Sequence, residues 1–219
     1  MIYYDLHTHN IQPITRHKFS ICNLPCGKSS FTNPGEYPDT YFSAGIHPWY
    51  ITSTKTESLI RQLIEIAPLP QILAIGECGL DKSIETPFAI QETIFKQQIE
   101  IAEKHKKPMI IHCVKAFNEL IRLHKELTPR QTWIIHGFRG KPQLAAELLQ
   151  HEIRISVGKQ FNPKINTILP PALLLLETDD NNIHIETVYT QAASTWSIPE
   201  KKLSTLIEKS FHILFRSPE

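Results

Sequence analysis

Acidic residues and histidines stand at or near the ends of several short apolar runs that lie far apart in this chain. Imidazole nitrogens and carboxylate oxygens are common protein ligands for divalent metal ions. If the runs are parallel strands, their carboxyl ends meet at one rim, and the polar side chains converge there. The six candidate ligands are His7, His9, Glu77, His112, His136 and Asp179.

The spacing of these residues places them on matching strand faces. A strand turns alternate residues to the same side, so His7 and His9 share one face, as do Ile75 and Glu77. The H-x-H pair alone is weak evidence for metal binding. Burying several unpaired charges is costly, however, so the joint convergence predicts a metal centre.

The candidate set contains four histidines and two carboxylates, more than one tetrahedral ion requires. A carboxylate can bridge two ions about 3.5 to 4 Å apart, and Glu77 is the natural bridge. We therefore expect two divalent ions as cofactors, and mixed nitrogen and oxygen ligands accept zinc, magnesium, manganese or iron. Such a site activates a water for attack on phosphorus. Glu77 and Asp179 are the predicted catalytic carboxylates, and Asp179 would orient that water or take its proton.

Three further residues are candidates for substrate binding. His47, in the segment Gly45-Ile46-His47-Pro48, also follows an apolar run, and we expect it to hydrogen-bond the substrate phosphate or the leaving oxygen. Two alternatives stay open for His47: completing the metal set, or packing under Trp49. Lys115 and Arg139 follow the fifth and sixth expected strands, where a cation would neutralise phosphate. A solvated surface charge is the alternative for each of them.

The apolar runs alternate with amphipathic segments, which predicts an α/β protein, specifically a TIM-like (β/α)8 barrel. The expected strands are residues 2–6, 18–22, 41–45, 72–76, 109–111, 132–135, 153–156 and 173–176. The expected helices are residues 55–67, 88–106, 118–127, 142–150, 185–194 and 199–215.

One helix of the regular barrel is missing from this pattern. Residues 23–40 contain three prolines and two glycines and show no apolar helical stripe. The second strand should therefore return to the third through a loop, giving a shortened barrel without a helix between strands 2 and 3. The exposed flank could be covered by the loop, or it could be a contact surface for a homo-oligomer.

Composition limits the remaining possibilities. With 219 residues, the chain is expected to form one domain, residues 1–219. A net charge of +1 excludes a whole-molecule field that would gather nucleic acid or anionic membrane. No segment resembles a signal peptide or a membrane span, so we expect a cytoplasmic protein with no membrane partner. Four scattered cysteines do not suggest a disulfide framework.

In its motifs, the chain resembles the TatD family of metal-dependent hydrolases. The resemblance rests on six motifs that occur in the family's order across nearly the whole chain, and together they are highly specific. They are Asp5-Leu6-His7-Thr8-His9, Gly45-Ile46-His47-Pro48, Ala74-Ile75-Gly76-Glu77-Cys78-Gly79-Leu80-Asp81, Pro108-Met109-Ile110-Ile111-His112, His136-Gly137-Phe138-Arg139-Gly140 and Leu176-Glu177-Thr178-Asp179.

The resemblance implies a TIM-like barrel and divalent-metal-dependent deoxyribonuclease or exonuclease activity on phosphodiesters, with DNA as the substrate class. It further implies that one ion binds His7, His9, Glu77 and Asp179, and that the other binds Glu77, His112 and His136. The chain departs from the family after the fifth strand, where Val114 and Lys115 occupy the region in which the family usually has an arginine. Another metal-dependent phosphoesterase, an amidohydrolase, and a metal-binding barrel used as an interaction scaffold are the alternative functions.

Overall fold

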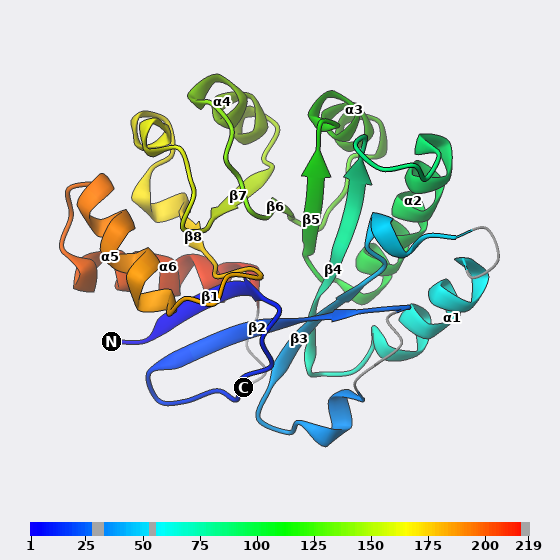
Figure 1. Ribbon diagram of the computed structural model, residues 1–219, viewed down its shortest axis with the longest axis horizontal. Coiled ribbons are helices and arrows are strands. Elements are labelled where there is room, and N and C mark those ends of the chain that lie inside the picture. The colour runs from blue at the N-terminus through cyan, green and yellow to red at the C-terminus, as the bar shows by residue number, and fades with distance from the viewer. Residues whose placement is uncertain (28–32, 53–55, 216–219) are drawn as a thin grey trace.

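The computed structural model describes residues 1–27, 33–52 and 56–215. Eight parallel strands follow one another around the sheet in sequence order, as the predicted barrel requires (Figure 1). The strands are β1 (Tyr3–Thr8), β2 (Lys18–Pro25), β3 (Tyr41–Gly45), β4 (Ile72–Asp81), β5 (Met109–Val114), β6 (Trp133–Ile135), β7 (Arg154–Val157) and β8 (Leu175–Leu176). The TIM-like barrel is therefore confirmed.

The last strand meets the first through a short contact. Asp179 N–H donates to the carbonyl oxygen of His7 at 2.8 Å, and His9 N–H donates to the carbonyl oxygen of Asp179 at 3.0 Å. These two bonds form a parallel bridge between Thr8 and Asp179. The closure of the barrel thus fixes the backbone of three predicted ligands against one another.

Six α-helices occur in the described part of the chain, at the positions that the apolar periodicity predicts. Each directs a buried stripe at the barrel, as Leu59 and Leu63 do in the first helix. The helices are α1 (Thr56–Ile66), α2 (Phe88–His105), α3 (Phe117–Leu127), α4 (Pro142–Gln150), α5 (Ile185–Thr195) and α6 (Glu200–Leu214). None of these helices combines the length and the apolar character needed to cross a membrane.

The described part of the connection between β2 and β3 contains only the short 3-10 turn Pro34–Glu36. This agrees with the predicted loss of a helix, although residues 28–32 lie outside the description. Nearby, aromatic side chains cover the outside of the first strands: the Phe19 ring lies 5.1 Å from the Phe211 ring of α6, and the Tyr4 ring lies 4.7 Å from it. The predicted homo-oligomer contact through residues 23–40 stays a prediction.

The strand β4 is longer and less regular than the sequence pattern suggests. All ten of its residues are buried, and it continues through Glu77 to Asp81 instead of ending at Gly76. Between Ile75 and Cys78 its pairing with β5 takes one extra residue, because Ile75 pairs with Met109 and Cys78 with Ile111. Such a bulge re-aims side chains near functional sites, and here it lies at Glu77.

Candidate metal centre

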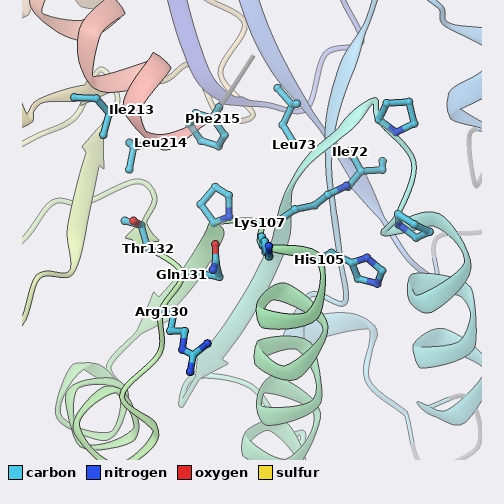
Figure 2. A pocket seen from close by; sticks show the side chains of 14 residues that line it. Ile72, Leu73, His105, Lys107, Arg130, Gln131, Thr132, Ile213, Leu214 and Phe215 are labelled. Atoms are coloured by element: carbon cyan, nitrogen blue, oxygen red, sulfur yellow. The ribbon is translucent and has the colours of Figure 1, made fainter. Parts of the chain in front are cut away.

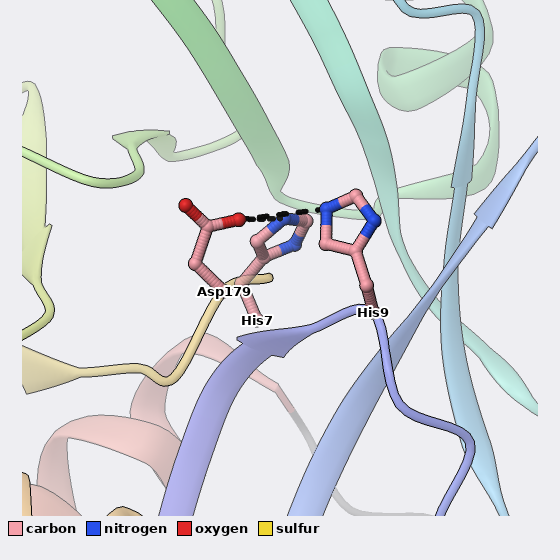
Figure 3. Close-up of side chains that lie close together, drawn as sticks. All are labelled: His7, His9 and Asp179. Atoms are coloured by element: carbon pink, nitrogen blue, oxygen red, sulfur yellow. Dashed lines mark ion pairs between the residues drawn. The ribbon is translucent and has the colours of Figure 1, made fainter. Parts of the chain in front are cut away.

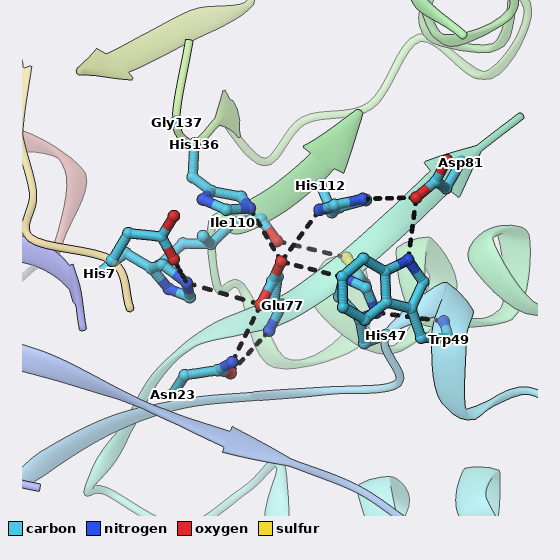
Figure 4. A network of polar contacts seen from close by, with 12 residues as sticks. His7, Asn23, His47, Trp49, Glu77, Asp81, Ile110, His112, His136 and Gly137 are labelled. Carbon is cyan, nitrogen blue, oxygen red and sulfur yellow. Dashed lines mark hydrogen bonds and ion pairs between the residues drawn. The ribbon is translucent and has the colours of Figure 1, made fainter. Parts of the chain in front are cut away.

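The Glu77 carboxylate lies at the middle of a cluster of histidines (Figure 4). It is only 4% exposed and is carried by the bulged part of β4. Three imidazole nitrogens surround its Oε1 atom: His136 Nε2 at 2.9 Å, His47 Nε2 at 3.1 Å and His112 Nδ1 at 3.2 Å. These side chains come from β5 and from the residues that follow β3 and β6, so the strand ends converge as predicted.

The second oxygen of Glu77 faces a different set of residues. His9 Nε2 lies 3.5 Å and His7 Nε2 lies 3.6 Å from Oε2. The same two imidazoles lie 3.5 Å and 3.7 Å from Asp179 Oδ1 (Figure 3). Asp179 has a φ of 56°, a left-handed conformation that aspartate tolerates better than most residues. The two oxygens of one carboxylate thus face two separate groups of ligand atoms.

The donor set fits bound divalent cations. Both ring nitrogens of His7 are buried without a hydrogen-bond partner in the described structure, which is expensive unless an additional group binds there. Three residue triplets bring nitrogen and oxygen atoms of the predicted ligands, and in one case of His47, within 4.8 Å of one another: His7, His9 and Asp179; His7, Glu77 and His136; and His47, Glu77 and His112. A fourth triplet combines His136, Glu177 and Asp179. The site is therefore a candidate metal centre that contains all six predicted ligands.

His47 and His112 face the same Glu77 oxygen with different tautomers. Trp49 N–H donates to His47 Nδ1 at 3.1 Å, so neutral His47 carries its proton on Nε2. His112 Nε2 lies 3.1 Å from the Asp81 carboxylate, which can only accept, so Nε2 donates there and Nδ1, 3.2 Å from Glu77 Oε1, is the ring nitrogen left to bind a cation. His112 is therefore arranged to ligate a cation, whereas His47 is arranged to donate a hydrogen bond.

The electrostatics of the site follow from the buried carboxylates. Burial would raise the pKa of Glu77, but the charge of His136 and hydrogen bonds from three histidines hold this pKa well below its usual value. Hydrogen bonds to Asp179 and Glu77 raise the pKa of His9 to about 9. Burial opposes charge on His136, yet Glu77 and Glu177 raise the pKa of His136 well above its usual value. Glu77 therefore stays ionised and attracts positive charge.

Three buried polar residues hold the ligands in place. Asn23 bonds Glu77 twice: its Nδ2 donates to Oε2 at 3.0 Å, and its Oδ1 accepts from Glu77 N–H at 3.2 Å. Asp81 accepts from His112, and Glu177 Oε1 lies 3.5 Å from His136 Nδ1. Carboxylates behind histidine ligands fix the imidazole orientation and raise its basicity.

Asn23 was not predicted as a site residue, because it lies just beyond the predicted end of the second strand, residues 18–22. The structure extends β2 to Pro25 and so carries Asn23 into the site. In the sequence, Asn23 differed from its neighbours only as a polar residue in an otherwise mostly apolar run. Asp81 and Glu177 lie inside the family motifs quoted above.

Lys115 and Arg139 are not brought into the cluster. Both are exposed, and neither lines the cavity above Glu77, which has a volume of about 160 Å³. The described residues that line this cavity are His9, Asn23, His47, Trp49, Tyr50, Glu77, His112, His136, Asp179 and Asp180. Contact of Lys115 and Arg139 with substrate stays a prediction.

A larger cavity, about 580 Å³, lies at the opposite end of the strands (Figure 2). It is lined by residues at the start of β4 and just before β5 and β6, together with Lys107, Arg130 and Phe215. None of the candidate metal-ligand groups found among the described residues lies there. The smaller cavity is therefore the one that lies at the candidate metal centre.

A parallel barrel with histidines and carboxylates gathered at the carboxyl ends of its strands is suited to hold divalent cations there. The model of the TatD related DNase family matches residues 27–216. This chain belongs to the TatD family.

Curated relatives agree with this assignment. The chain is 32% identical over 154 residues to the uncharacterized metal-dependent hydrolase YjjV of Escherichia coli, covering 65% of this chain and 59% of that protein. It is 30% identical over 155 residues to the 3'-5' ssDNA/RNA exonuclease TatD of Citrobacter rodentium, covering 65% and 58%. The chain thus matches less than two thirds of the length of these relatives.

Solved structures show the same fold. The crystal structure of E. coli YjjV superposes with a TM-score of 0.77 at 23% identity, covering 91% of this chain and 87% of that one. The TatD family hydrolase of Entamoeba histolytica gives a TM-score of 0.78 at 14% identity, covering 100% and 99%. At these identities the structural similarity shows the barrel fold alone and does not indicate a substrate.

Proposed function

We propose that this protein is a two-metal phosphodiesterase that hydrolyses nucleic-acid chains. The proposal rests on how the two oxygens of the Glu77 carboxylate are placed. Oε1 faces one group of imidazoles, and Oε2 faces another. A carboxylate placed in this way is suited to bridge two cations. Membership of the TatD family and the nuclease names of its relatives support the same activity.

The proposed ligand sets follow from the two faces of Glu77. His7, His9, Asp179 and Glu77 Oε2 would hold one ion, and His112, His136 and Glu77 Oε1 would hold the other. When bound, divalent ions supply a water of lowered pKa and positive charge against the phosphate. Zinc, manganese, magnesium and iron all accept this mixture of ligands.

The protein side chains would orient the substrate and the attacking water. His47 has its Nε2 proton directed into the site and a pKa lowered by burial, so it is a neutral donor for a phosphate or leaving-group oxygen. Asp179 has a pKa of about 2: burial opposes its charge, but the His9 hydrogen bond and the neighbouring histidines outweigh burial. An ionised Asp179 facing the cavity would accept a hydrogen bond from the attacking water.

A substrate panel with metal-loaded protein tests this proposal. It comprises single-stranded DNA, single-stranded RNA, duplex DNA, a phosphomonoester, an amide and a lactone. We expect cleavage of nucleic-acid phosphodiesters that is abolished by chelation and restored by adding a divalent ion. Glu77→Gln should lower this rate at least about 100-fold, since metal ligation and charge are both weakened.

The control is Glu147→Gln, which removes an exposed carboxylate of α4 and should leave the rate unchanged. A fully metal-loaded protein that cleaves the amide or the lactone but none of the phosphodiesters would contradict the proposal. Full activity of Glu77→Gln would contradict the role of the bridge.

A further inference from the structure

One tryptophan stands exposed at the edge of the candidate metal centre. Trp49 is 61% exposed, whereas Trp133 and Trp196 are 0% and 8% exposed. The Trp49 side chain lines the same cavity as Glu77 and His112. A large aromatic ring left in solvent beside a reactive site offers its face to a ligand at little conformational cost.

The orientation of this indole is fixed by its surroundings. Its Nε1–H donates to Asp81 Oδ2 at 2.9 Å, and Asp81 itself is 1% exposed (Figure 4). The ring packs edge-to-face against His47, with centroids 5.0 Å apart and planes at 83°. It also lies 6.0 Å from the His112 ring at 73°. The polar edge and one side of the ring are therefore held, while much of the ring remains open to solvent.

We infer that Trp49 is a stacking platform for one unpaired nucleobase of the substrate. This inference rests on the proposed function, since a phosphodiester lying over Glu77 would bring the base of a neighbouring nucleotide to the indole beside His47. Aromatic side chains bind bases of single strands through their faces with little sequence preference. A base inside a duplex is already stacked on both faces, so the platform favours single-stranded chains.

Removing the platform should reduce the preference for substrates that contain bases. The experiment compares a single-stranded oligodeoxyribonucleotide with a wholly abasic oligomer of the same length, which keeps every phosphodiester. The ratio of their kcat/KM values is measured within each variant, so losses of folding or metal content cancel. We expect Trp49→Ala to lower this ratio about 5- to 150-fold, the range of one base stack, and Trp49→Phe to lower it less. Ile64→Ala, an exposed apolar truncation on α1, is the control.

Fluorescence provides a second measurement that does not require hydrolysis. Because the other two tryptophans are buried, quenching by an added oligonucleotide in chelator reports mainly on Trp49. We expect quenching by the base-containing oligomer, little by the abasic one, and loss of the signal in Trp49→Phe. This result would support the platform even if no phosphodiester were cleaved, in which case only the proposed function would fail.

Two results would overturn the inference. The first is cleavage of oligonucleotides with the same ratio in wild type and Trp49→Ala. The second is equal quenching, or no quenching, by the two oligomers.

Discussion

Asn23 and Glu77 are joined by two hydrogen bonds, although β3 lies between the strands that carry them. The Asn23 amide group donates to the carboxylate at 3.0 Å, and its carbonyl oxygen accepts from the Glu77 backbone at 3.2 Å. Both residues are buried. One amide therefore sets the position of the carboxylate and of the backbone that carries it.

Asn23→Ala should consequently weaken metal binding while leaving the ligands in place. Loss of a residue that orients a ligand typically costs about 10- to 100-fold in metal affinity. Competition against a chromogenic chelator would measure the affinity, and circular dichroism would check the fold. Asn118→Ala, an exposed change on α3, should leave the affinity unaltered. Unchanged affinity in Asn23→Ala would show that Glu77 is held by other contacts.

The tautomers of His47 and His112 predict opposite outcomes for their replacement. His112→Ala should lower metal content, because the Nδ1 ligand atom beside Glu77 is lost. His47→Ala should retain metal but lower turnover by about 100-fold, the size expected for a lost hydrogen-bond donor. Elemental analysis and initial rates measure the two effects separately. Loss of metal from His47→Ala would instead assign His47 to the ligand set.

Metal binding should release protons near neutral pH. Histidine binds a metal through a deprotonated nitrogen, whereas in the metal-free protein hydrogen bonds to Asp179 and Glu77 raise the pKa of His9 to about 9. At pH 7 a cation must displace that proton, so metal affinity should rise as the pH increases from about 7 to 9. Calorimetric titrations in two buffers with different heats of ionisation would measure the released protons. Affinity that does not change over this interval would contradict the predicted protonation of His9.

Gly79 is required by the close approach of β4 and β5. Its φ is 141°, and a Cβ atom there would lie 2.0 Å from the carbonyl oxygen of His112. Gly79→Ala should therefore destabilise the fold by about 2 kcal/mol or more, since backbone atoms would have to move. Urea unfolding measures this change. Gly35→Ala, whose nearest new contact is 3.4 Å from the Asn33 side chain, should cause little loss. Equal stability of the two variants would show that β4 and β5 can separate at no cost.

Much of this architecture was predictable from apolar periodicity. The eight strands and six helices were predicted because the spacing of apolar residues shows which face of each element must be buried. The convergence of the six predicted ligands followed from the parallel direction of the strands. The β4 bulge was not predictable, because the pairing that creates it depends on β5, which begins about 30 residues further along the chain.

The hydrogen bonds around the candidate metal centre could not be predicted from the sequence pattern either. Asn23 bonds Glu77, and Trp49 bonds Asp81, only after distant segments have been brought together. No periodicity in the chain records such pairs. Lys115 and Arg139 illustrate the opposite case, because a suitable position after a strand did not bring either side chain to the lining of the cavity.

In the proposed function, one carboxylate, Glu77, bridges two cations. The most direct test is the metal stoichiometry of the chain after loading and removal of free ions, measured by elemental analysis on wild type and Glu77→Gln. We predict two divalent ions for each wild-type chain and the loss of at least one in the variant. A wild-type chain that holds a single ion, or a variant that keeps both, would contradict the bridge.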